Sequence, residues 1–227
     1  MGCRSATPVC SIFACGYAGF RFYFDFAERV MGSITQWKKQ LTRFIVGNRP
    51  ALNRAERNLI TTRLERRHTV LEWGSGPCTV YFSPLVASYY SIQHDEHRYN
   101  RVQRELDRHR RANVQHLLIP PSQSRRGAPN HARPSESRYE QYRDYIEYPA
   151  QLGIPRFDRV LINGRSRPEC AQAVLPLLAP DAFVFIFDYF GSSYPAGEFE
   201  RLLGDSYEVV DFVPSNRTLA VLRARAS

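Results

Sequence analysis

The sequence LEWGSGPCT, residues 71–79, decides the fold of this 227-residue chain. It places the acidic residue Glu72 at the end of a short apolar run, directly before the turn Gly74–Gly76. Glycines at such a point let the backbone turn tightly and approach a ligand with no Cβ in the way. The helical run that follows offers backbone N–H groups with no partner inside the helix. A strand, a glycine turn and a helix in this order predict a ligand-binding loop in an α/β unit.

Strand-like and helix-like runs alternate on the C-terminal side of this loop. The strand-like runs, including the one that leads into the loop, cover residues 69–72, 89–93, 113–119, 159–162 and 182–187. The helix-like runs between them cover residues 78–88, 97–112, 139–152 and 168–178. Short apolar strands separated by helices predict βαβ units and a parallel sheet with helices on both faces.

The last two strand-like runs do not follow this alternation of strands and helices. Residues Tyr207–Val213 and Thr218–Arg223 both have strand character, but only four residues separate them. Four residues cannot carry a parallel crossover, so this pair must form an antiparallel hairpin. We therefore predict a Rossmann-like α/β fold with a seven-stranded, mostly parallel sheet and one reversed strand near its edge.

Two helices are expected ahead of the first strand, within residues 34–68. Apolar residues recur at helical spacing from Gln36 to Ile45 and again from Leu52 to Leu64. Asn53, with Glu56 three residues later, resembles a capping box that opens the second of these helices. We therefore expect the folded domain to cover residues 34–227.

Two segments differ in composition from the rest of the chain. Residues 1–33 are expected to form a poorly ordered extension, since their signal-peptide and lipidation patterns are both weak. Residues 120–137, PPSQSRRGAPNHARPSES, are rich in Pro, Ser and Arg and show no apolar periodicity. The second segment is expected to be either a flexible insertion or a loop that orders over a substrate.

The composition excludes several classes of protein. With 43% hydrophobic and 23% charged residues, the chain is not collagen-like, coiled-coil or wholly disordered. No apolar run reaches the roughly 18–20 residues that a membrane span needs. The five cysteines are odd in number and contain no Cys-x-x-Cys pair, so neither a disulfide framework nor a zinc site is indicated. A reducing compartment, the cytoplasm, is therefore expected.

The chain is strongly basic, with a net charge of +9. All of its 31 basic residues except Lys38 and Lys39 are arginines. A positive surface favours acidic ligands, nucleic acid or anionic membranes. Because the arginines are mixed with acids along the chain, we favour a basic enzyme over a nucleic-acid-binding protein.

Polar residues follow the predicted strands where each strand ends. Gln93, His94 and Asp95 lie 17 to 19 residues after Gly76, a distance at which nucleoside-binding α/β folds place a side chain that bonds ribose hydroxyls. Asp95 is also a good N-cap for the next helix. Asn163, Gly164 and Arg165 follow the fourth strand, and Asp188 follows the fifth. Polar groups at the ends of adjacent central strands converge on one cleft.

These stretches resemble the class I S-adenosylmethionine-dependent methyltransferases. The nearest pattern is a branch that reads LEWGSGGST, SIEHD and VLIDGRAR with a Cys shortly after, then HD or HDY at the fifth strand. The corresponding stretches here are LEWGSGPCT (71–79), SIQHD (91–95), VLINGRSRPEC (160–170) and FDYF (187–190). The resemblance runs from about Leu52 to the C-terminus, and the terminal hairpin belongs to that fold.

The resemblance implies that S-adenosyl-L-methionine is the cofactor. It assigns cofactor binding to Glu72, Gly74, Ser75, Gly76, Gln93, His94, Asp95 and Asn163. Within this set, the glycine loop would hold the methionine part and the end of the second strand would hold the ribose. The stretch after the fourth strand would border the sulfonium.

Three departures from that pattern bear on activity. Gln93 and Asn163 replace a Glu and an Asp, so each position loses a carboxylate. Pro77 and Cys78 replace small residues, which stiffens the loop. A catalytically inactive binding module of the same fold is therefore an alternative, and so is a nucleic-acid-binding or nucleic-acid-modifying protein. The glycine loop and the terminal hairpin both argue against an NAD-dependent oxidoreductase.

Methyl transfer from a sulfonium is an in-line displacement, so the protein has to align two reactants and remove a proton. Asp188 is the preferred base and His94 the second choice, with Asn163 and Arg165 as further catalytic candidates. We expect no metal, because Asn163 and Tyr189 stand where a metal-dependent enzyme would need carboxylates. Arg165 and Arg167 suit an acidic small-molecule acceptor, because guanidinium groups bind carboxylates through forked hydrogen bonds.

Overall fold

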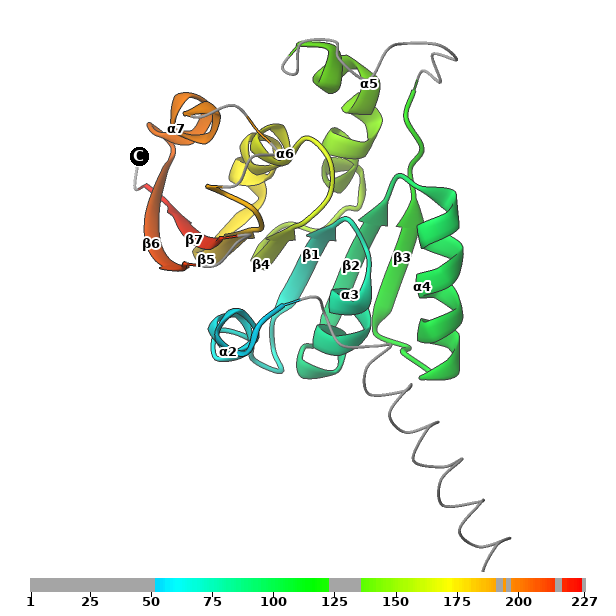
Figure 1. Ribbon diagram of the computed structural model, residues 1–227. Coiled ribbons are helices and arrows are strands. Elements are labelled where there is room, and N and C mark those ends of the chain that lie inside the picture. Colours follow the sequence, from blue (N-terminus) through cyan, green and yellow to red (C-terminus); the bar gives the residue numbers. More distant parts are fainter. Residues whose placement is uncertain (1–51, 123–135, 191–193, 195–196, 215–217, 226–227) are drawn as a thin grey trace, which may run out of the picture. The chain divides into compact units, whose positions relative to one another are not determined.

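A seven-stranded sheet runs through the part of the chain that the computed structural model describes, residues 52–122, 136–190, 194, 197–214 and 218–225 (Figure 1). The strands are β1 (Thr69–Trp73), β2 (Ser88–Gln93), β3 (Val114–Leu118), β4 (Phe157–Ile162), β5 (Leu178–Ile186), β6 (Tyr207–Val213) and β7 (Leu219–Ala224). Their order in the sheet is β3-β2-β1-β4-β5-β7-β6.

The pairing of the strands confirms the predicted fold class. The five strands from β3 to β5 pair in parallel. Strand β7 pairs antiparallel with both β5 and β6, so it is reversed relative to every other strand and lies one position from the edge. Parallel strands buried on both faces have apolar side chains on both sides, which is why the strand runs read as nearly continuous apolar segments.

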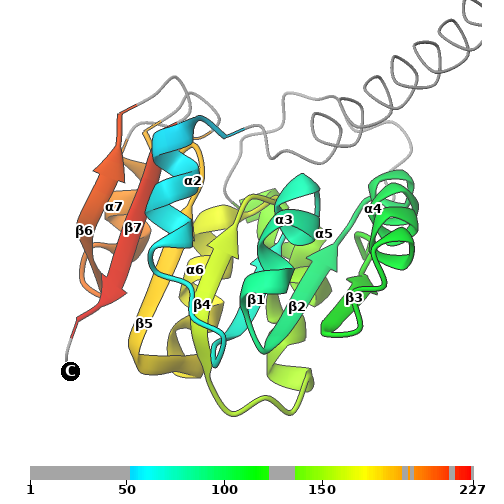
Figure 2. The same ribbon diagram turned by 90° about the horizontal axis from the view of Figure 1, so that it is seen from below.

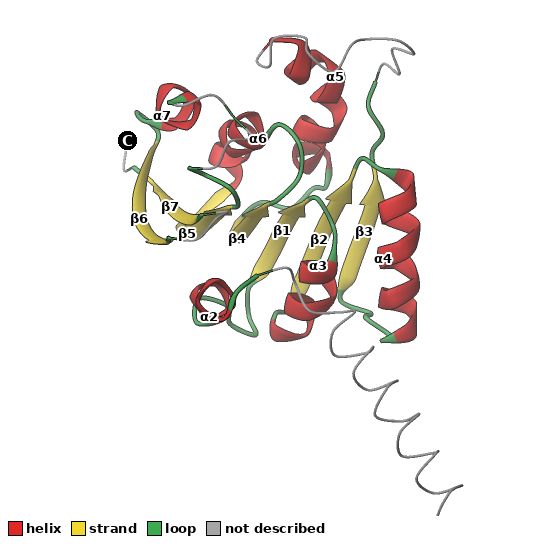
Figure 3. Ribbon diagram, viewed as in Figure 1, coloured by secondary structure: helices red, strands yellow, loops and turns green. Residues whose placement is uncertain are grey.

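Helices cover both faces of the sheet, as Figures 1 and 3 show. The α-helices are α2 (Arg54–Thr61), α3 (Pro77–Phe82), α4 (Glu96–Arg108), α5 (Glu136–Glu147), α6 (Arg167–Val174) and α7 (Glu198–Leu203). Short 3-10 turns follow α3, α5 and α6 at Ser83–Leu85, Tyr148–Gln151 and Leu175–Leu177. Helices α2 and α3 lie on the face seen in Figure 2, and α5, α6 and α7 lie on the opposite face.

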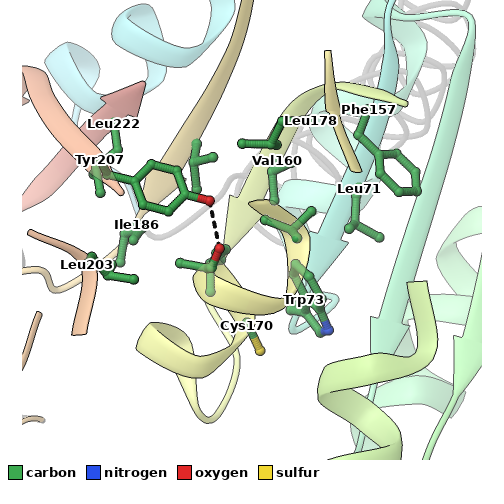
Figure 4. Close-up of a cluster of buried hydrophobic side chains, with 14 of the residues drawn as sticks. Leu71, Trp73, Phe157, Val160, Cys170, Leu178, Ile186, Leu203, Tyr207 and Leu222 are labelled. Atoms are coloured by element: carbon green, nitrogen blue, oxygen red, sulfur yellow. Dashed lines mark hydrogen bonds between the residues drawn. The ribbon is translucent and has the colours of Figure 1, made fainter. Parts of the chain in front are cut away.

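Each face of the sheet carries its own hydrophobic core. Successive residues of a strand point to opposite faces, so Val70 packs toward α3 while Leu71 packs toward α5 and α6. The larger cluster includes Trp73, Val160, Ile186 and Leu222 (Figure 4). In this cluster the buried Tyr207 hydroxyl donates a hydrogen bond to the Ala171 carbonyl oxygen at 2.6 Å, so its polar atom is satisfied.

The capping box predicted at Asn53 is confirmed. The Asn53 side chain accepts a hydrogen bond from the Glu56 N–H at 2.9 Å, and the Glu56 carboxylate accepts one from the Asn53 N–H at 2.8 Å. The two reciprocal bonds satisfy N–H groups that have no partner inside α2.

Some predicted element ends differ from the structure. The helix expected over 168–178 ends at Val174 and gives way to a 3-10 turn, because Pro176 has no N–H to continue the helix. Strand β5 begins at Leu178, four residues before the predicted start. Helix α7 was not predicted.

Several predictions concern residues outside the described ranges. The extension over 1–33, the helix expected from Gln36 to Ile45 and most of the insertion over 120–137 belong to this group. The domain boundary at residue 34 therefore stays a prediction. No helix among the described residues is both long and apolar enough to cross a membrane.

Candidate functional site

Two loops meet backbone to backbone at the carboxyl ends of β1 and β4. Gly74 has a φ of +89°, and a Cβ at this position would lie 2.6 Å from the Gly164 Cα. A Cβ on Gly164 would in turn collide with the Tyr145 hydroxyl. Both positions therefore require glycine. At Gly76, by contrast, a Cβ would meet nothing within 4 Å, so the loop is open on that side.

Glu72 lies fully buried beneath this loop. Its Oε2 accepts hydrogen bonds from the Thr79 hydroxyl at 2.5 Å and the Ser91 hydroxyl at 2.7 Å. Its Oε1 has no hydrogen-bond partner among the described residues. Burial raises the pKa of Glu72 from 4.5 to about 7, although the hydroxyl groups of Thr79, Ser91 and Tyr89 lower it. The buried Tyr89 hydroxyl interacts with this carboxylate without forming a hydrogen bond of normal geometry, so Oε1 keeps the capacity to accept one.

Gln93 connects the glycine loop to the end of β2. Its fully buried side-chain amide donates to the Ser75 carbonyl oxygen at 2.9 Å and to the Ser75 hydroxyl at 3.2 Å. Its Oε1 accepts from the backbone N–H groups of His94 at 2.9 Å and Asp95 at 3.1 Å. The side chain predicted to bind ribose is thus engaged entirely with two loops of the protein.

His116 on β3 supports the same loop and was missed by sequence reasoning. Its Nε2 lies 2.9 Å from the Ser75 hydroxyl and its Nδ1 lies 3.0 Å from Oε1 of Gln103. The imidazole ring stacks on Tyr99, with 4.2 Å between ring centroids. Burial lowers the pKa of His116 to about 4, so the ring is neutral at neutral pH. Nothing in the strand pattern around residue 116 signals this contact.

His94 and Asp95 follow Gln93 at the end of β2. Asp95 caps α4 as expected, accepting the Arg98 N–H at 2.7 Å. The His94 ring packs edge-on against Tyr142 and Tyr145, each with 5.4 Å between ring centroids. Burial, together with the nearby charge of Arg165, lowers the pKa of His94 to about 4. A nitrogen with so low a pKa accepts a proton poorly at neutral pH, which makes His94 a poor general base.

Arg167 ties the ends of β4 and β5 together. Its guanidinium donates to the carbonyl oxygens of Gly164 and Phe187 and lies 3.5 Å from the Asp188 carboxylate. Ser166 and Asp188, at the two strand ends, both have left-handed backbone conformations, with φ of 52° and 58°. Such conformations are uncommon outside glycine and concentrate at functional sites.

The structure brings the predicted site residues to one edge of the sheet. The loop after β1 contacts the loop after β4 through its glycines and the end of β2 through Gln93. Asp188 joins this set through Arg167, whose guanidinium lies 3.5 Å from its carboxylate. Asn163 and Arg165 are exposed, whereas Arg167 is bound to carbonyl groups, so Arg165 is the freer arginine for an acceptor. Their roles in binding or catalysis remain predictions.

No cluster of three or more His, Cys, Asp or Glu side chains within the described ranges could hold a metal ion. The expectation that the reaction needs no metal stays a prediction.

Comparison with known proteins gives a consistent result at the level of the fold. No protein-family model and no curated protein matches the sequence. Among solved structures, a methyltransferase-like protein from Silicibacter pomeroyi is similar at 18% identity, with a TM-score of 0.54, over 78% of this chain and 88% of that one. An rRNA methylase from Streptococcus thermophilus is similar at 12% identity, with a TM-score of 0.54, over 77% and 99% of the two chains.

A third similar structure contains a bound molecule. It is a candidate methyltransferase from Streptococcus mutans in complex with SAH, similar at 12% identity and a TM-score of 0.52 over 77% of this chain and 99% of that one. At such low identities the similarities establish the arrangement of the sheet and helices.

Proposed function

We propose that this chain, whose described part has the class I methyltransferase fold, binds S-adenosyl-L-methionine and transfers its methyl group to a small-molecule acceptor. The observation that carries the proposal is the loop after β1. Gly74 and Gly164 hold it in close backbone contact with β4, while Gly76 leaves its other side open. Beneath it, the buried Oε1 of Glu72 has no partner among the described residues.

The residues at this edge fit the cofactor by their chemistry. The open backbone at Gly76 admits a ligand without steric conflict. The positive ammonium of a methionine moiety bound beside Glu72 would lower the raised pKa of its carboxyl and favour the charged form. When bound, the cofactor would supply an electrophilic methyl group. The chain's own residues would then hold and orient the two reactants.

An acidic acceptor agrees with the charges near the end of β4. Arg165 is exposed there, and a guanidinium binds a carboxylate through two parallel hydrogen bonds. Asp188 would take the acceptor's proton, with Arg167 holding its carboxylate at 3.5 Å.

Calorimetric titration tests the cofactor assignment directly. We expect S-adenosylmethionine and S-adenosylhomocysteine each to give saturable heat at one site per chain, with NAD as a control that gives none. Binding of the first two compounds is expected because the loop after β1 is open to a ligand at Gly76. No binding of NAD is expected because the loop lacks the third glycine of the dinucleotide-binding pattern. Heat from NAD alone, or from none of the three compounds, would contradict the proposed function.

A row of arginines on α4 favours a second candidate function, the binding or modification of nucleic acid. Arg98, Arg101, Arg104 and Arg108 are all exposed and follow one another at intervals of three or four residues, which places them on one side of the helix. Within the described ranges, only Arg108 of these four forms an ion pair, with Glu105 at 2.9 Å. A row of guanidinium groups, three of which form no ion pair within the described ranges, suits a phosphodiester backbone.

RNA binding at several salt concentrations distinguishes the two candidates. If the α4 row binds phosphates, replacing Arg98, Arg101 and Arg104 together by Gln should weaken binding of single-stranded RNA. It should also reduce the slope of log affinity against log salt by about 2. A matched control replaces the exposed Arg66, Arg67 and Arg201 by Gln and removes the same charge. Equal slopes for the two triple variants would exclude α4 as the binding surface.

A further inference from the structure

The side chain of Gln93 has no hydrogen-bonding capacity left for a ligand. A primary amide has two N–H donors and a carbonyl oxygen with two lone pairs. In Gln93 the amide nitrogen donates to two atoms of Ser75, and the oxygen accepts from the backbone N–H groups of His94 and Asp95. The side chain is also fully buried. This position therefore already has four partners inside the protein.

The contact with Ser75 needs an amide and cannot be made by a carboxylate. The Ser75 carbonyl oxygen lies 2.9 Å from the Gln93 nitrogen and can only accept a hydrogen bond. A glutamate of the same shape, which the SIEHD pattern carries at this position, would place a charged oxygen against that carbonyl. The loop conformation seen here and a carboxylate at residue 93 are therefore incompatible.

Ser75 is also held by hydrogen bonds that run from its hydroxyl group to His116 and on to Gln103. The Gln103 oxygen can only accept, so the proton of His116 lies on Nδ1 and its Nε2 accepts from the Ser75 hydroxyl. The Gln103 amide nitrogen donates onward to Asp107 at 2.8 Å. The bonds run from Gln93 through Ser75 to His116, and so connect β2, the glycine loop, β3 and α4. Such connected networks rigidify the groups that they join.

We propose that Gln93 is a positioning residue, which fixes the glycine loop through Ser75 and takes no part in binding ribose. The part of this proposal that concerns ribose rests on the proposed function. The hydrogen bonds from Gln93 to Ser75, in contrast, are a property of the folded chain itself. The exchange of a carboxylate for an amide at residue 93 thus converts a ligand-binding position into a support for the loop.

The first arm of the test is the stability of Gln93→Glu. At pH 8 we expect its melting temperature to fall by about 5–10 °C, because the Ser75 carbonyl loses its donor and a charge becomes buried. The matched control is Gln115→Glu on the exposed side of β3, which should change the melting temperature by no more than about 2 °C. A Gln93→Glu protein as stable as this control would overturn the proposal.

The second arm uses pH to separate a lost donor from a general packing defect. At pH 5 a buried glutamate is protonated and regains one O–H donor toward Ser75. The difference in melting temperature between the wild type and Gln93→Glu should therefore be about half as large at pH 5 as at pH 8. The titrating groups around this position are Glu72, His94, Asp95, Asp107 and His116, and both proteins contain them. The same difference in melting temperature at pH 5 and pH 8 would contradict the role of residue 93 as a hydrogen-bond donor to Ser75.

The third arm measures binding of S-adenosylhomocysteine by calorimetry. A positioning role predicts that Gln93→Glu weakens binding at least 10-fold. If residue 93 instead bound the ribose hydroxyls, a charged glutamate would be the stronger acceptor and binding would become tighter. Tighter binding would therefore overturn the proposal. If the wild type binds no cofactor, the proposed function fails, and the two stability measurements still decide whether Gln93 holds the glycine loop through Ser75.

A further variant applies if Gln93→Glu does not fold. Ser75→Ala removes the hydroxyl between Gln93 and His116 but keeps the bond to the Ser75 carbonyl oxygen. We expect a folded protein in which the backbone amides of residues 74–76 exchange with solvent at least 10-fold faster than in the wild type. Unchanged exchange would show that this network does not hold the loop.

Discussion

Replacing Gly74 with alanine is expected to lower the melting temperature by roughly 4–24 °C. The new Cβ would lie 2.6 Å from the Gly164 Cα, where the contact is with backbone and cannot be relieved by a side-chain rotation. The φ of +89° adds conformational strain for any residue with a side chain. Overpacking and strain each cost about 1–3 kcal/mol, and a domain of this size loses roughly 2–4 °C per kcal/mol.

The matched control for this prediction is Gly76→Ala, two residues along the same loop. Its Cβ meets nothing within 4 Å and its φ of −172° is extended backbone, so its melting temperature should stay within about 2 °C of wild type. If the proposed function is right, the same methyl group should weaken binding of S-adenosylmethionine, because it occupies the open side of the loop. Equal melting temperatures for the two variants would mean that the loops after β1 and β4 do not touch in solution.

The second large effect is expected for Glu72→Gln, and it depends on pH. In the folded chain the pKa of Glu72 is about 7 against an ordinary value of 4.5, because burial disfavours the charged form. A raised pKa in the folded state means that this residue's contribution to stability is complete below pH 4.5 and is lost as the pH rises through 7. The loss amounts to about 3 kcal/mol. Glutamine does not titrate, so the variant should gain stability relative to wild type by about this amount between pH 4.5 and pH 8.

Urea denaturation at pH 5 and pH 8 measures this difference. The amide oxygen of a glutamine can still accept hydrogen bonds from Thr79 and Ser91, so the local packing is kept. His94 and His116, whose pKa values are lowered to about 4, give the wild type a slope of the opposite sign, but the variant shares them. Glu96→Gln at the exposed start of α4 is the control. A Glu72→Gln effect independent of pH would contradict a protonation change at this carboxylate.

Much of the fold could be predicted because it depends on local patterns. The four residues between the last two strand runs forced an antiparallel pair, and β7 is indeed reversed. Helix α7 escaped prediction because it has only six residues, too few to display a helical period. The start of β5 was missed because Pro180 and Asp181, which are disfavoured in strands, lie inside it.

The candidate site was less predictable because its contacts join residues far apart in the sequence. The glycine loop and the Asp95 cap follow from neighbouring residues, and the structure has both. The His116 contact with Ser75 spans 41 residues, and the Arg167 contact with Phe187 spans 20. The type of residue at 93 shows that a carboxylate is missing, but only the positions of the Ser75 atoms show what the amide does instead.

The position of β7 between β5 and β6 has a consequence for the order of folding. Chains are synthesised from the N-terminus, so β6 is made before the strand that joins it to the sheet. Until β7 pairs, β5 has a free edge and β6 has no partner strand. The charge of Asp211 disfavours pairing of β6 with another chain during that interval. We therefore expect closure of this hairpin to be a late step in the folding of the sheet.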